Sequence, residues 1–173
     1  MKNKFLAVFL SILFFQPLMG ENLNIQSSEI SIDKKSRLTI FKGEVVAKDN
    51  KNNIFKTNYA EYKKDLKFLK SKGETTILTS EGYSLVGTNI IFDNKNRFIK
   101  SNDKATIKDL ENNNIYLENF EYSTENNFFK STGKIKIVDS KNNSYNFSQI
   151  YIDEKRREII GADIKAFLNQ ENF

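Results

Sequence analysis

The sequence predicts an all-β domain of stacked antiparallel strands, built from repeated units of about 30 residues. The first observation is a marker that returns once per unit at that step: Phe41–Glu44, Ser71–Glu74, Ser101–Lys104 and Ser131–Lys134. The second is the spacing of polar turns, which leaves only segments of strand length between them. The third is the composition of those segments, which favour Ile, Val, Phe, Tyr and Thr, the residues that fit a pleated surface.

The N-terminal segment, residues 1–20, stands apart from the repeats and is predicted to be a secretory signal peptide. A basic start is followed by an apolar run from Phe5 to Phe15 and a short segment that ends at Gly20. The run is too short to cross a bilayer of roughly 30 Å as a helix, although an uncleaved anchor is the alternative. We therefore expect a mature domain over residues 21–173 that works outside the cytoplasm, without a disulfide because the chain has no cysteine.

The first strand of each unit is predicted to bury one face. Small apolar or β-branched residues fall two apart, with more polar residues between them: Val45 and Ala47, Thr75 and Ile77, Ala105 and Ile107, Ile135 and Ile137. Large apolar residues at the strand entrance are expected to form a further inward column: Leu38, Phe68, Phe98 and Phe128. A glycine interrupts the strand at positions 43, 73 and 133, which predicts a bulge or bend there.

The second strand of each unit carries two apolar clusters that are out of phase by one residue. The first cluster comprises Phe55, Leu85, Ile115 and Tyr145, with Thr57, Gly87, Leu117 and Phe147 two residues later. The second comprises Ala60, Ile90, Phe120 and Ile150, with Tyr62, Phe92, Tyr122 and Ile152 two residues later. A slip of one residue turns side chains to the other face, so it predicts a bend at this place in every unit. The last unit departs from the period, because Asp163 replaces an apolar residue, and we expect an altered edge there.

The composition excludes most catalytic chemistry. The chain has no His, Cys or Trp, which removes Ser-His-Asp and Cys-His nucleophile systems, and it carries no glycine-rich phosphate loop. We interpret the recurring Asp33, Asp93 and Asp153 as turn formers, and expect neither an enzyme nor a cofactor or metal site. The net charge of +5 is spread along the chain, so a nucleic-acid partner is not expected.

Two segments carry a resemblance to a known family. The repeated pattern seen in residues 38–47, with the sequence LTIFKGEVVA, and in residues 57–62, with the sequence TNYAEY, resembles the LptA/OstA-like domains of lipopolysaccharide transport. The resemblance covers roughly residues 22–168. It implies an open, twisted β-jellyroll, or β-taco, in the periplasm. Its apolar interior would shelter the acyl chains of lipid A and pass lipopolysaccharide towards the outer membrane, and its edges would pair with other Lpt domains.

The groove-lining residues that we predict on this basis are the apolar columns described above. They are Leu38, Val45, Phe68, Ile77, Leu85, Ile90, Phe92, Phe98, Ile107, Leu117, Phe120, Phe128, Ile135, Ile137, Phe147 and Ile150. Facing sheets can also fill the space between them with their own side chains. Each of these residues is therefore explained equally well as an ordinary core residue.

Two kinds of family member fit the chain, the free-standing bridge protein LptA and the N-terminal domain of the outer-membrane protein LptD. The closing segment, residues 161–170, resembles the point where an LptD domain continues towards its C-terminal outer-membrane barrel, whereas the lack of cysteine favours LptA. From a different class, the alternative is a structural or adhesive exported β-repeat protein with a filled core and no lipid cargo.

Overall fold

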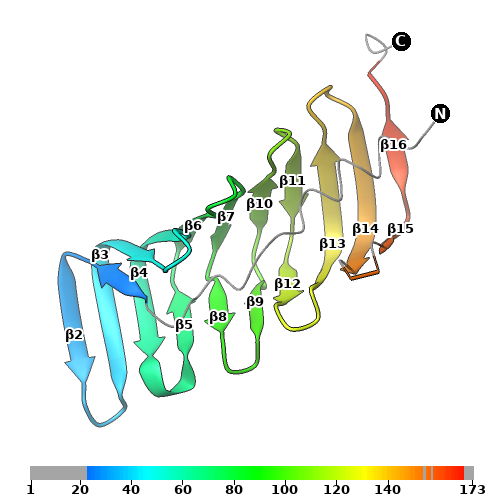
Figure 1. Ribbon diagram of the computed structural model, residues 1–173. Coiled ribbons are helices and arrows are strands. Elements are labelled where there is room, and N and C mark those ends of the chain that lie inside the picture. Colours follow the sequence, from blue (N-terminus) through cyan, green and yellow to red (C-terminus); the bar gives the residue numbers. More distant parts are fainter. Residues whose placement is uncertain (1–22, 154, 157, 170–173) are drawn as a thin grey trace.

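The computed structural model describes residues 23–153, 155–156 and 158–169, and these residues form one 16-stranded antiparallel sheet. The predicted all-β class is confirmed, as is the repeat. The strands stack side by side from β2 at one end to β15 and β16 at the other (Figure 1). The predicted signal peptide, residues 1–20, lies outside the described residues. Within them, no helix is long and apolar enough to cross a membrane.

The strands follow the predicted alternation of strand and turn. Their bounds are β1 Asn24–Gln26, β2 Glu29–Asp33, β3 Leu38–Lys48, β4 Ile54–Lys63, β5 Phe68–Ser71, β6 Glu74–Leu78, β7 Ser84–Thr88, β8 Ile91–Asp93, β9 Phe98–Ser101, β10 Ala105–Lys108, β11 Asn114–Leu117, β12 Phe120–Ser123, β13 Phe128–Val138, β14 Ser144–Asp153, β15 Glu158–Ala162 and β16 Lys165–Phe167. A single 3₁₀ turn, Lys64–Leu66, is the only helical element among the described residues.

The sheet folds over into two layers because its long strands bend near their middle. The first half of β3 pairs with β2 and its second half pairs with β1, and β4 divides in the same way between β5 and β6. The first layer continues through β8, β9, β12 and β15, and the second layer continues through β7, β10, β11 and β16. The two layers are therefore joined along one side, the bend, and end in separate rows of turns on the other.

Glycine bulges produce the bend, as the sequence predicts. Gly43, Gly73 and Gly133 have φ values of 70°, 80° and 88°, a left-handed conformation that favours glycine. The pairing of β3 with β4 shifts register between Lys42 and Val45, and the pairing of β13 with β14 shifts at the corresponding place. The phase slip of the second strand is also confirmed, because Thr57 and Ala60 are both buried although they lie three positions apart, where regular alternation would put them on opposite faces.

One predicted inward column lies on the other face. Leu69, Ile99 and Phe129 are buried at 0%, 5% and 5% exposure, whereas the residues that precede them are half-buried. Successive strand residues point to opposite sides, so the inward orientation predicted for one set is wrong. That set is Leu38, Phe68, Phe98 and Phe128.

Candidate functional site

The space between the two layers is the candidate site, because it gathers nearly all of the buried apolar residues. Twelve of the sixteen predicted lining residues lie there, each at most 6% exposed. They are Val45, Ile77, Leu85, Ile90, Phe92, Ile107, Leu117, Phe120, Ile135, Ile137, Phe147 and Ile150. The four others, which face outward, are the column corrected above.

The two layers pack directly on each other. Phe55 of the second layer meets Phe92 of the first edge to face, with ring centroids 5.4 Å apart. The cavity between the layers measures about 10 Å³, and its walls are Ile77, Leu85, Ile99, Ile107, Phe120, Tyr122 and Phe129. That volume holds no more than a single water molecule. At this place in the stack, side chains of the two layers fill the space between them.

A column of buried serines lies along the bend. Ser71, Ser101 and Ser131 are at most 1% exposed and occupy equivalent places in successive units. The Ser101 hydroxyl donates to the Thr88 carbonyl oxygen and the Ser131 hydroxyl to that of Asn119, each at 2.6 Å. Because bulges interrupt the strand ladder at the bend, these hydroxyls satisfy backbone groups that would otherwise lack partners. In the sequence, a serine begins three of the four repeated segments that start at residues 41, 71, 101 and 131. Hydrophobic alternation alone does not reveal that these serines are buried.

The outer rim of the second layer is joined from one unit to the next by asparagine side chains. Asn113 is fully buried, and its amide nitrogen donates to Asp109 Oδ2 at 2.7 Å. Its Oδ1 accepts the backbone N–H of Ser140, in the next unit, at 2.9 Å. Asn53 and Asn143 make the same bonds to Ser80 and Asn169. These bonds join neighbouring turns of this rim at three places.

The rim of the first layer consists of turns that are also bonded to their neighbours: the backbone N–H of Asn94 donates to the Lys67 carbonyl oxygen at 3.1 Å, and that of Thr124 to the Arg97 carbonyl oxygen at 2.8 Å. Asp93 Oδ1 accepts the backbone N–H of Asn96 at 2.8 Å, and Asp153 accepts that of Arg156 at 3.0 Å. The interpretation of these aspartates as turn formers is confirmed. Tyr62, which packs against the core from this side, is partly buried, and burial raises the pKa of its hydroxyl. No group of three carboxylates or other ligands suited to a metal ion occurs within the described segments.

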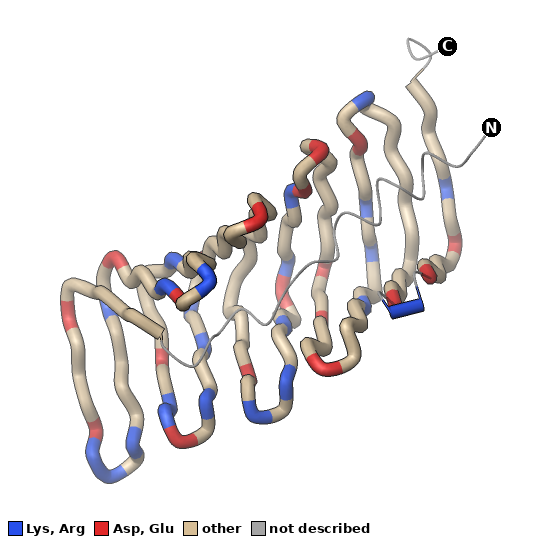
Figure 2. The backbone as a smooth tube through the Cα atoms, viewed as in Figure 1, with Lys and Arg blue, Asp and Glu red and all other residues tan. Residues whose placement is uncertain are grey.

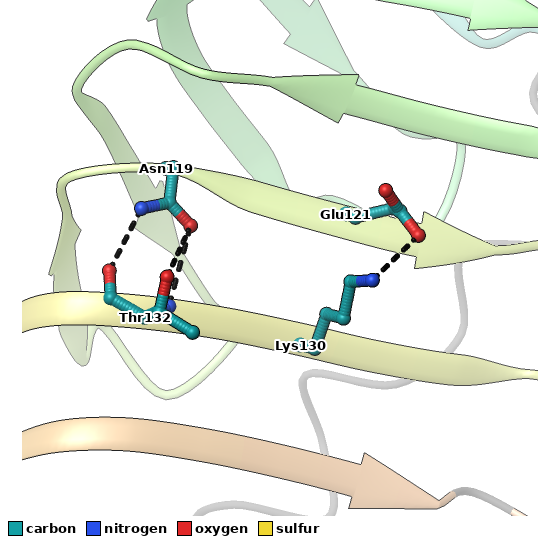
Figure 3. A network of polar contacts seen from close by, with 4 residues as sticks. All are labelled: Asn119, Glu121, Lys130 and Thr132. Atoms are coloured by element: carbon teal, nitrogen blue, oxygen red, sulfur yellow. Dashed lines mark hydrogen bonds and ion pairs between the residues drawn. The ribbon is translucent and has the colours of Figure 1, made fainter.

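The outer face of the first layer is polar and makes its own contacts. Lys130 pairs with Glu121 at 3.0 Å, and Asn119 exchanges bonds with the backbone of Thr132 at 2.8 and 3.2 Å (Figure 3). The outward Phe98 lies under the Lys100 ammonium, 4.9 Å from its ring centroid. Such contacts explain how large aromatic residues are accommodated outside the core.

The chain was also compared with known proteins. Its sequence matches no protein-family model and no curated protein. Among solved structures, it is similar to LptH of Pseudomonas aeruginosa, described as the LptA-homologous periplasmic component of a lipopolysaccharide transport device. The two share 12% sequence identity, with a TM-score of 0.33, over 88% of this chain and 99% of that one.

Proposed function

We propose that this domain carries lipopolysaccharide in the periplasm, sheltering the acyl chains of lipid A between its two layers. The observation that carries the proposal is the form of the interior. It is apolar along the stack, and it is bounded by a bonded bend on one side only. Acyl chains need such a surface and no polar anchor, because each buried methylene contributes about 0.8 kcal/mol.

The filled interior means that the layers have to separate to admit cargo. The contacts between the layers near the centre are apolar, such as Phe55 against Phe92, and they have no directional requirement. An acyl chain that enters replaces one apolar contact with another, so much of the lost packing is recovered. The bend acts as the hinge, because its glycine bulges and serine bonds remain in place while the rims move apart.

The two ends of the stack are proposed to pair with neighbouring domains of the same transport system. Ile30 and Ile32 of the terminal strand β2 are 56% and 67% exposed. Ile30 is opposite the inward-facing Phe41 in the register, so it extends the apolar inner surface beyond the last covered strand. A strand added to this edge would cover it and continue the interior into the next domain. An outer-membrane barrel, if one belongs to the same protein, would connect to the domain at the opposite end of the stack, at β15 and β16.

The proposal is tested by photo-crosslinking in a host that makes lipopolysaccharide. A photoreactive residue at Phe120, on the wall of the interior, or at Tyr62, near its rim, should crosslink to lipopolysaccharide. The same residue at Phe98, on the outer face, is the matched control and should give much less product. Equal crosslinking at all three positions, or none at Phe120 and Tyr62 in a folded protein, would refute the proposal.

The second candidate is a structural or adhesive β-repeat protein that carries no cargo. The interior cavity of about 10 Å³ specifically favours it, because a filled core needs no ligand. This candidate predicts that the protein purifies free of lipid and that its interior positions never crosslink to lipid.

A further inference from the structure

A second hollow lies on the outside of the molecule, on the face of the second layer that points away from the core. It has a volume of about 590 Å³ and is bordered by β11, β13, β14 and β16. Four lysines line it: Lys104, Lys134, Lys136 and Lys165. Figure 2 shows basic segments partway along β13 and on β16, the strands that contribute three of them.

Strand register places two of these lysines, Lys136 and Lys165, in one row on the outer face. Lys136 is opposite Tyr116 on one side and Asn146 on the other, and Asn146 is opposite Lys165. Opposed residues of adjacent strands share a face, and two strand spacings separate Lys136 from Lys165, which amounts to about 10 Å. Both lysines are exposed, and their ammonium groups can therefore reach the same ligand from two sides.

The hollow carries an excess of positive charge. Its one carboxylate, Glu118, accepts the backbone N–H of Lys134 at 3.1 Å. None of the four lysines belongs to an ion pair found in the described part of the chain. The corresponding positions near the bend in the first two units are Glu44 and Glu74, so the positive charge belongs to the later units alone.

Two exposed aromatic rings beside the hollow can contact an apolar face of a ligand. Tyr116 is 45% exposed beside Lys136, and Phe167 is 58% exposed beside the end of β16. An exposed ring next to cationic groups suits a ligand with both a flat apolar face and anionic substituents, and a phosphorylated sugar has both. Free phosphate has no face for the rings to contact.

We propose that this hollow binds a phosphorylated saccharide, the chemical class of the lipopolysaccharide headgroup, on the outside of the second layer. As a headgroup site it rests on the proposed function, and it adds the chemical class that the outer surface recognises. The lysines contact phosphate, and Tyr116 stacks on a sugar ring. The second layer thus serves the cargo on both faces, apolar inside and cationic outside.

The test uses a deacylated, bis-phosphorylated glucosamine disaccharide and the full chain, with binding followed by NMR titration. Wild-type protein should bind it in a salt-dependent manner, and at least tenfold more tightly than either the unphosphorylated disaccharide or inorganic phosphate. The double variant K136Q/K165Q should weaken binding at least tenfold. The matched double variant K48Q/K56Q removes two exposed lysines from the same face outside the hollow and should bind as wild type does. The variant Y116A should lose the preference for the disaccharide over inorganic phosphate.

Three outcomes would overturn the proposal: absence of binding, equal weakening by both double variants, and equal affinity for inorganic phosphate. Equal weakening would indicate general charge attraction, and equal affinity would indicate a simple anion site. Because the probe has no acyl chains, its binding does not require the layers to separate. Failure here is therefore distinct from failure of the crosslinking experiment with whole lipopolysaccharide.

Discussion

The two layers build their inner surfaces differently. The second layer presents small and β-branched residues in strict alternation, for example Val45 and Ala47 or Ile135 and Ile137. The first layer presents aromatic residues such as Phe92, Phe120 and Phe129, with serines at the bend. The second layer also carries Phe55 and Phe147, and the first also carries Ala60, so each inner surface combines short and long side chains. The difference is one of proportion, and it shows that the first layer depends more on aromatic contacts and the second more on β-branched ones.

The largest expected effect is that of a charge placed in the second layer. Ile107 is 1% exposed and lines the small interior cavity, so I107D should lower the free energy of unfolding by more than about 4 kcal/mol. The adjacent T106D places the same charge on the outer face and should cost under about 1 kcal/mol. Urea denaturation measures both. Similar losses for the two variants would contradict the assignment of faces.

The next effect tests the corrected orientation of the first layer. Leu69 is fully buried, and L69A should destabilise the protein by about 3 kcal/mol, because truncation leaves a cavity. The preceding F68A removes a larger but half-buried outer side chain and should cost about 1 kcal/mol or less. If F68A proved the more damaging of the two in urea denaturation, the column at Phe68 would be the inner one after all.

A smaller effect is expected at the rim of the second layer. N113A removes a buried amide and leaves Asp109 Oδ2 and the N–H of Ser140 without this partner, so we expect a loss of about 2 kcal/mol. The control E111A changes an exposed side chain in the same turn, whose backbone bond to Asp109 remains. Hydrogen exchange at Ser140 should accelerate in N113A only. Unchanged exchange there would show that the rim bonds do not couple neighbouring units.

The smallest effect concerns pH at the rim of the first layer. The Ser36 hydroxyl, at 2.7 Å, and the backbone N–H of Lys35 donate to the Asp33 carboxylate and lower its pKa. A lowered pKa means that the stabilisation is present above the ordinary value of about 3.9 and is lost as the pH falls through the folded-state value. D33N should therefore have a lower Tm than wild type at neutral pH, and the gap should close in acid. A gap that is independent of pH would refute this assignment.

The difference between the layers also decides how much the sequence could predict. The inner face of the second layer was predicted correctly because its strands alternate apolar and more polar residues after the bulge. In most units only one of two successive residues is apolar, so hydrophobicity identifies the inner one. In the first layer, Phe68 precedes Leu69 and Phe128 precedes Phe129, so hydrophobicity alone does not choose the inner face. The buried serine two residues later chooses it, since it has to reach the backbone at the bend.

The sequence predicted most of the residues that line the candidate site, but not whether their side chains fill the space between the layers. Twelve lining residues follow from periodicity, yet whether facing side chains meet or leave a cleft depends on the distance between the layers, which no local pattern encodes. The lysine-lined hollow was not predictable either. Its lysines come from segments far apart in the sequence, and only the register of β13, β14 and β16 brings Lys136 and Lys165 into one row.

The central claim, that the layers separate around acyl chains, is tested most directly by the distance between the two rims. The chain has no cysteine, so single cysteines at Lys95 and Glu111, exposed in turns of the first and second layers, accept spin labels without interference. Pulsed electron paramagnetic resonance measures the distance between the two spin labels with and without lipopolysaccharide. We predict a clear lengthening on addition of lipopolysaccharide and none with its deacylated saccharide. A distance that stays the same while lipopolysaccharide is bound would contradict the account.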